Sequence, residues 1–200
     1  LLGVLILIIT TFCLPTLRNR PEGKRSGRED AMNRHVKETP QESPEQVSLQ
    51  WRLIYKNPSV LHLGLIYFCF GLSYVIFVTF YAAYLIREGG LTEAEAGGLW
   101  AVTGIISIIS GITWGTASDR LGRKYGLALV FLIQAIAFYI FTVKTDITFL
   151  AASILFGVTA WSTPAIMAAA AGDYTGPRLA PATLGYITVI FGVGQALGPS

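Results

Sequence analysis

Four charged side chains lie close together in one short segment, Gly115-Thr116-Ala117-Ser118-Asp119-Arg120-Leu121-Gly122-Arg123-Lys124, which separates two long apolar runs. Placing one Asp, Arg or Lys at the centre of a membrane helix costs about 2.5 to 3.5 kcal/mol, so burying all four would cost roughly 10 kcal/mol. The segment is therefore predicted to be a turn in water beside a membrane. The apolar runs on either side are predicted to be transmembrane helices.

Asp119 is placed at the end of the first of these helices, where the helix dipole is already negative. A carboxylate in that position needs a compensating cation, and Arg120 and Arg123 are the local candidates. Gly115 would allow two helices to approach closely, and Gly122 would allow a tight turn. A solvated turn that only sets the membrane topology is the alternative interpretation.

The pattern G-x-x-[AS]-D-R-x-G-R-K between two spanning helices resembles the cytoplasmic signature loop of the major facilitator superfamily. The resemblance implies a gating motif made of Gly115, Ser118, Asp119, Arg120, Gly122, Arg123 and Lys124. It also implies that Asp119 contacts helix 5 of a carrier in the outward-facing state and loses this contact when the cytoplasmic side opens. Residues 172–178 (GDYTGPR) and 192–199 (GVGQALGP) further resemble the YbfB-type branch of the superfamily.

Aromatic residues recur at alternating intervals of three and four along residues 59–86, which places them on one face of a helix; they are Tyr67, Phe70, Tyr74, Phe77, Tyr81 and Tyr84. Such a stripe is commonly packing. The Tyr74 hydroxyl, however, lies near the middle of its run and needs a partner away from headgroup water. The superfamily resemblance implies that helices 7 and 10 line the transport cavity, so Tyr67 and Tyr74 are candidates for the cavity wall, with packing as the alternative.

The run 147–171 carries a proline, Pro164, at membrane depth. Proline removes one backbone amide and would free the Ala160 carbonyl, so a kink is expected, with a neighbouring hydroxyl or water on that carbonyl. The kink is either static or, in a rocking carrier, a hinge. Trp161 and Ser162, beside it, are further candidates for the cavity wall.

Two glutamines, Gln134 and Gln195, are single polar groups at membrane depth. Gln195 is the better cavity candidate, because the superfamily resemblance places helix 9, which carries Gln134, at the periphery. No Asp, Glu, Lys or Arg lies deep in any predicted span. A proton relay needs ionisable groups inside the membrane, so a titrating group for proton coupling is expected in a missing half of the protein. The same pattern argues against an intramembrane hydrolase, and no catalytic, metal or cofactor site is predicted.

The elements that position these residues follow from composition and hydropathy. The chain is 52% hydrophobic and only 14% charged, with a mean hydropathy of +0.55, which is too apolar for a soluble domain. A membrane core about 30 Å thick needs roughly 20 apolar residues of helix. The predicted spans are 59–86, 94–117, 125–143, 147–171 and 183–200, and Thr92 and Glu95 are spaced to form a capping box before the second.

The fold class is predicted to be an all-α integral membrane protein of the superfamily's helix-bundle type. Residues 1–14 are expected to end transmembrane helix 6, residues 15–57 to form the central cytoplasmic linker, and residues 58–200 to form a truncated C-terminal bundle. The chain opens and closes inside apolar runs, so it is interpreted as a fragment that reaches from the end of helix 6 through most of helix 11.

The predicted function is secondary active transport of a small organic solute by alternating access, proton-coupled through the missing N-terminal half. A non-transporting membrane receptor or scaffold that kept the carrier fold is the alternative, and an intramembrane enzyme is third. The expected partners are the solute, the lipid bilayer and the missing half. Nucleic acid is not expected, because the basic residues lie in loops rather than on one folded face.

The orientation follows from the loops, which alternate in basic charge. Of the 15 Lys and Arg residues, 13 lie in the linker, the charged turn and Arg178, and 2 lie on the other side, at Arg87 and Lys144. The positive-inside rule therefore predicts that residues 15–57, the turn and Arg178 are cytoplasmic. The expected location is a bacterial-type plasma (inner) membrane, which the protein crosses several times.

This topology predicts that cysteines at Ser26 and Gly90 are modified from opposite faces of the membrane. In a full-length protein without Cys13 and Cys69, an impermeant thiol reagent should modify Gly90→Cys in intact cells and Ser26→Cys only after permeabilisation. Modification of Ser26→Cys from outside intact cells would reverse the predicted orientation.

Overall fold

The computed structural model describes residue 52 and residues 54–199, so the predictions for residues 1–14 and for most of the linker 15–57 lie outside the described residues. The regular structure is α-helical throughout this part. The helices are α4 (Pro58–Arg87), α5 (Glu93–Leu121), α6 (Arg123–Phe141), α7 (Asp146–Thr159) and α8 (Ser162–Leu197). The prediction of an all-α fold is confirmed.

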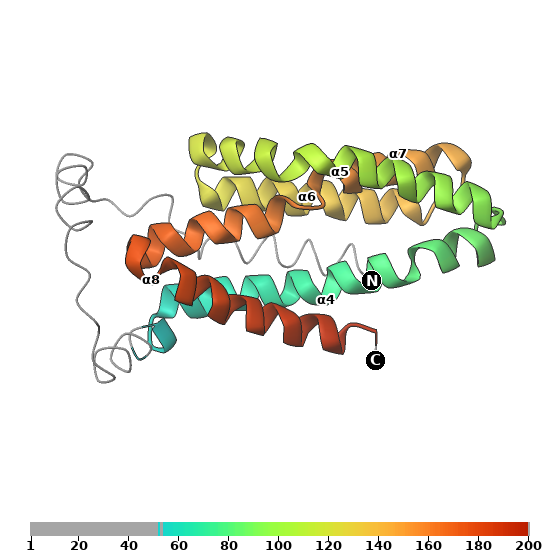
Figure 1. Ribbon diagram of the computed structural model, residues 1–200. Helices are drawn as coiled ribbons and strands as arrows, with labels where there is room; N and C mark the ends of the chain where they lie inside the picture. The colour runs from blue at the N-terminus through green and yellow to red at the C-terminus, as the bar shows by residue number, and fades with distance from the viewer. Residues whose placement is uncertain (1–51, 53, 200) are drawn as a thin grey trace.

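The helices lie in two groups (Figure 1). α4 packs mainly against the end of α8, while α5, α6 and α7 pack together. α8 turns back on itself at Gly176, whose φ of 79° and ψ of 166° suit glycine. Its first part, residues 162–175, and its second part, residues 177–197, therefore run in opposite directions (Figure 1).

Four helical stretches in the described part are long and apolar enough to cross a membrane: α4, α5, α6 and the stretch Asp146–Leu197. The last contains 52 residues. As a straight helix it would measure about 78 Å, more than twice the roughly 30 Å of a membrane core. Because it folds back at Gly176, it can supply two crossings; it contains the predicted span 147–171 and the predicted span 183–200 as far as Leu197.

Side chains define where the first two helices begin. Before α4, the Asn57 side-chain oxygen accepts the Ser59 N–H, and Pro58 occupies the first helical position. Before α5, the Glu95 N–H donates to the Thr92 hydroxyl at 3.3 Å, and the Thr92 N–H donates to the Glu95 carboxylate at 2.8 Å. The predicted capping box is confirmed.

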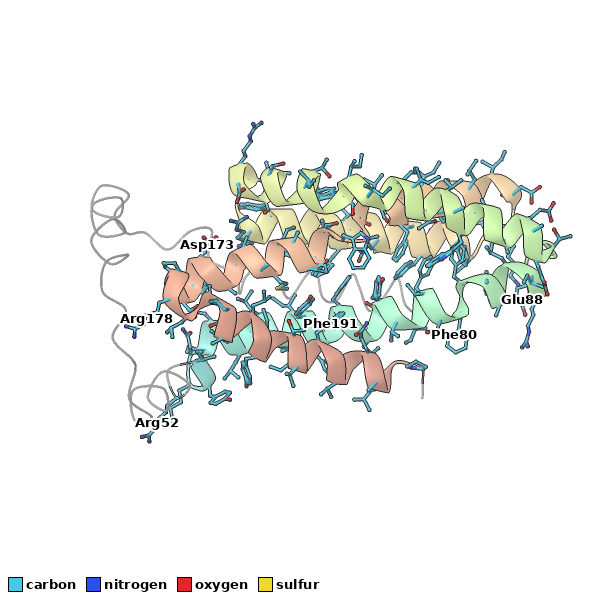
Figure 2. All side chains as sticks on the ribbon, in the orientation of Figure 1. Arg52, Phe80, Glu88, Asp173, Arg178 and Phe191 are labelled. Atoms are coloured by element: carbon cyan, nitrogen blue, oxygen red, sulfur yellow. The ribbon has the colours of Figure 1, made fainter. Side chains whose placement is uncertain are left out.

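An ion pair joins two loops at the end of the bundle opposite Gly176. Lys144, after α6, donates to the Glu88 carboxylate, after α4, at 2.7 Å (Glu88 is labelled in Figure 2). The hydrogen bond lowers the pKa of Glu88 and raises the pKa of Lys144. Both side chains are exposed, so water screens the attraction, and its main effect is to keep the two loops together.

The part of the α4 aromatic stripe nearer Glu88 is packing. The Phe77 ring lies 4.4 Å from the Phe138 ring and 4.5 Å from the Phe156 ring, measured between centroids. The Tyr81 hydroxyl forms a hydrogen bond with the Ser153 hydroxyl and is almost fully buried. These rings and hydroxyls fix α4 against α6 and α7.

Glycines bring α4 and the second part of α8 into backbone contact. A Cβ atom at Gly194 would lie 2.3 Å from the Phe68 carbonyl oxygen, and one at Gly71 would lie 2.5 Å from the Phe191 carbonyl oxygen. Neither position can hold a larger residue without moving a helix. Close contact of this kind is how membrane helices gain van der Waals energy without a hydrophobic driving force.

This contact predicts that Gly194→Ala destabilises the folded protein by about 1 to 3 kcal/mol, because the methyl group must displace backbone. Gly192→Ala is the matched control, since a Cβ there would meet nothing within 4 Å. Thermal unfolding of the two purified variants in one detergent provides the comparison. Equal melting temperatures would show that the contact between α4 and α8 is looser than described.

Candidate functional site

A pocket of about 280 Å³ lies where α4, the connection between α7 and α8, and the second part of α8 meet. This volume is near the lower end of the roughly 300 to 1,000 Å³ typical of small-molecule sites. The residues that line it are Tyr67, Phe70, Tyr74, Ala160, Trp161, Pro164, Phe191 and Gln195. Four of the five cavity candidates, all except Ser162, and the hinge candidate Pro164 therefore meet at one site, although they come from distant parts of the sequence.

Aromatic rings form most of the pocket wall. The Tyr67 and Phe191 rings stack with centroids 4.4 Å apart, and the Phe70 and Tyr74 rings lie 5.4 Å apart. Phe191 was not a sequence candidate, because an apolar ring in an apolar run carries no signal of its own. Figure 2 places it midway along the bundle, between Asp173 near one end and Glu88 near the other.

Besides the Trp161 indole N–H, the residues that line this pocket carry three polar side-chain groups: the hydroxyls of Tyr67 and Tyr74 and the carboxamide of Gln195. Within the described part of the chain, none of the three has a hydrogen-bond partner. Unpaired polar groups at membrane depth are costly, so a solute or water in the pocket would stabilise them. A bound solute or water would supply the partner that the Tyr74 hydroxyl lacks among the described residues.

Ser162 lies beside the pocket but does not line it. Its side chain is fully buried, and its hydroxyl donates to the Thr159 carbonyl. Gln134 also donates to that carbonyl, at 3.3 Å from the amide nitrogen to the oxygen. Ser162 and Gln134 therefore stabilise the helix break, and a role for Ser162 in contacting a solute is not supported by its position.

The helix break itself differs from the expected proline kink. α7 ends at Thr159 and α8 begins at Ser162, so Pro164 lies in the first turn of a new helix, where proline is tolerated. The side-chain bonds go to the Thr159 carbonyl and not to the Ala160 carbonyl that the sequence indicated. The physical reason is that the last carbonyls of a helix have no partner within the helix. Because α7 ends at Thr159, before the kink that Pro164 alone would cause, the Thr159 carbonyl is among those left free.

At the end of the bundle that carries the charged turn, Arg123 joins three helices. Its guanidinium lies 2.6 Å from Asp119 at the end of α5 and 2.8 Å from Asp173 in α8, and it donates to the Ser118 hydroxyl at 2.7 Å. The Arg123 side chain is only 16% exposed, whereas the carboxylates of Asp119 and Asp173 are 59% and 43% exposed. One cation therefore holds two carboxylates near the bundle surface.

The sequence identified Arg123 as a partner for Asp119 but missed Asp173. Asp173 lies 50 residues further along the chain, just beyond the predicted span 147–171. The sequence feature that could have identified Asp173 is its position: it is a carboxylate at the end of a predicted helix, on the side of the membrane where the charged turn is predicted. Arg120, the other predicted cation, is exposed and makes no ion pair with a described residue.

The remaining residues of the motif shape the turn. Gly122 lies between α5 and α6 with a φ of 94°, and the Ser118 hydroxyl donates to the Gly115 carbonyl at 2.8 Å. Lys124 lies over the ring of the next residue. A Cβ at Gly115 would meet nothing within 4 Å, so no described helix makes the close approach expected at Gly115. The close contact lies instead at Gly126 in α6, where a Cβ would lie 2.7 Å from the Ser118 Cβ in α5.

The arrangement combines a pocket without formal charge and a charged cluster at one end of the bundle. The pocket can hold a solute by ring contacts and hydrogen bonds, and the cluster can hold three helices together. Among residue 52 and residues 54–199, no group of three or more His, Cys, Asp or Glu side chains could hold a metal ion.

Comparisons of the sequence with known proteins identify a family. The family model described as Major Facilitator Superfamily matches residues 1–199. The human protein named Solute carrier family 67 member A1 is 31% identical over 121 residues, which cover 58% of this chain and 28% of that relative. The chain thus spans less than a third of the relative's length. No solved structure matches this chain. The narrower YbfB-type resemblance stays a prediction.

Proposed function

Because the chain belongs to the Major Facilitator Superfamily, whose members are membrane transporters and not enzymes, we propose that it is the C-terminal part of a secondary carrier. In this proposal the carrier moves a small organic solute across the membrane by alternating access. The relative's name, which calls that protein a solute carrier, supports the same general function.

The pocket at the helix break is the observation that carries the proposal. It lies midway along the bundle and collects Tyr67, Tyr74 and Gln195, whose polar groups have no partner among the described residues. A scaffold without a ligand would have no need to keep unpaired polar groups at membrane depth, whereas a receptor would bind a ligand there without moving it. Superfamily carriers bind their solutes near the bilayer midplane, at the interface between repeats, which agrees with this position.

The pocket wall in this part of the protein offers the solute no formally charged side chain. The lining residues are aromatic, aliphatic or amide, and none is charged at neutral pH. Coupling to protons would then use an ionisable group elsewhere in the full-length carrier. Recognition would depend on stacking with the rings and on hydrogen bonds to Tyr74 and Gln195.

The Arg123 cluster is proposed to act as a latch on the cytoplasmic side. Arg123 fixes the end of α5 and the first part of α8 to α6, and the exposed part of the Asp119 side chain is free to meet another helix of the full-length protein. Opening of that side would then require charged contacts to separate. The proposed location is a bacterial-type plasma (inner) membrane, with residues 15–57 in the cytoplasm.

Flux of small organic solutes into proteoliposomes that contain the full-length protein tests the proposal. We expect saturable flux, and we expect Tyr74→Phe to weaken the apparent affinity by about 0.5 to 1.5 kcal/mol if its hydroxyl bonds the solute. Tyr139→Phe is the control, because Tyr139 is 70% exposed and does not line the pocket.

A correctly inserted protein that supports no flux of any solute offered would favour the receptor or scaffold. Flux with wild-type affinity in both Tyr74→Phe and Tyr74→Ala would instead support transport and show that Tyr74 does not bind the solute.

A further inference from the structure

We propose that Ser110, Trp114 and Gln134 are positioning residues, which hold the helix break, and with it Trp161, at the wall of the pocket. None of the three lines the pocket. The proposal deepens the carrier function described above and rests on it only where it connects the break to the latch.

The break leaves backbone groups without helical partners in the middle of the bundle, and these side chains supply the partners. The Trp114 indole N–H donates to the Val158 carbonyl at 2.9 Å. The Trp161 N–H donates to the Ser110 hydroxyl at 3.0 Å, and Gln134 donates to the Thr159 carbonyl. Proline alone would remove one amide, whereas three bonds from α5 and α6 fix both sides of the break.

These bonds set the position of Trp161. The bond from its own N–H ties its backbone to α5, and α5 lies beside it, since a Cβ at Gly111 would be in van der Waals contact with the Trp161 carbonyl oxygen, at 3.5 Å. Ala160 and Pro164, which also line the pocket, lie on the same short stretch of backbone as Trp161. A change in the angle between α7 and α8 would therefore move three of the lining residues together.

The same face of α5 connects the break to the charged cluster. Ser110, Trp114 and Ser118 are spaced by four residues, so they lie along one side of the helix. Ser118 accepts a hydrogen bond from Arg123, which also binds Asp173.

The first part of α8, residues 162–175, is therefore held at both ends, to α5 by the Ser110 bond at the break and to α6 by the Asp173–Arg123 pair near its other end. A solute that changes the position of Trp161 would then favour one of two arrangements of the Asp173 end. In a carrier, this gives the pocket a physical connection to the latch.

Spin labels on either side of the break can measure its bend in the full-length protein in lipid nanodiscs. Ile154→Cys in α7 and Ala168→Cys in α8 are both exposed, and a straight helix would separate them by about 21 Å. The variants to compare are Trp114→Phe, which keeps a ring and removes the N–H, and Ser110→Ala, which removes the acceptor. Trp100→Phe is the matched control on the same helix, where the Trp100 ring packs on Tyr81.

We expect Trp114→Phe and Ser110→Ala each to change the ratio of bend populations by about two- to tenfold, the effect of losing one hydrogen bond. Trp100→Phe should match the wild type. Asp173→Asn should also shift the bend, because it releases the far end of residues 162–175.

An unchanged bend distribution in Trp114→Phe and Ser110→Ala, even with a lower melting temperature, would overturn the proposal and leave these residues a purely structural role. A changed bend in those variants together with an unchanged bend in Asp173→Asn would overturn the connection to the latch. Failure of the carrier function would appear separately, as an absence of solute flux in the wild-type protein.

Discussion

Inside a bilayer, a backbone N–H or C=O must find its hydrogen-bond partner within the protein, and this constraint governs the structure described here. Continuous helices meet it along α4, α5 and α6. The connection between α7 and α8 does not meet it with backbone alone, and side chains from α5 and α6 bond three of its backbone groups, the Val158 and Thr159 carbonyls and the Trp161 N–H. The pocket lies at this interruption, where side chains and not helix geometry position the wall.

The same constraint separates the polar chemistry of the bundle into two kinds. At membrane depth the polar groups are hydroxyls and amides, which are neutral and can bond to carbonyls or to a solute. Full charges are confined to the ends, where Arg123 binds Asp119 and Asp173 at one end and Lys144 binds Glu88 at the other. In a carrier, recognition in the neutral middle and control at the charged ends are then physically distinct, and α5 and α8 connect them.

Much of this could be predicted from local sequence patterns. Apolar runs and the charged turn identified the membrane class, and the spacing of Thr92 and Glu95 identified a capping box. Helical periodicity and depth placed Tyr67 and Tyr74 on one face of α4, and the structure brings both to the pocket.

Contacts between distant segments could not be predicted in this way. Nothing in the sequence ranks Asp173 above other carboxylates as a partner for Arg123, because their contact depends on the fold-back of α8. Likewise, Gln134 and Ser162 are polar residues at membrane depth, as cavity residues often are, yet both donate to the Thr159 carbonyl. Their role depends on where α7 ends, and tertiary packing sets that end.

The central proposal is that the pocket opens alternately to the two sides of the membrane under the control of the Asp119, Arg123 and Asp173 cluster. The most direct test is the rate at which an impermeant thiol reagent modifies Gln195→Cys from each side, in a full-length protein whose Cys13 and Cys69 are replaced by serine. The account predicts modification from both sides, with Asp119→Asn raising the ratio of cytoplasmic to opposite-side rates by about fivefold, the effect of losing about 1 kcal/mol of charged contact. Modification from one side only, or a ratio that Asp119→Asn leaves unchanged, would contradict it.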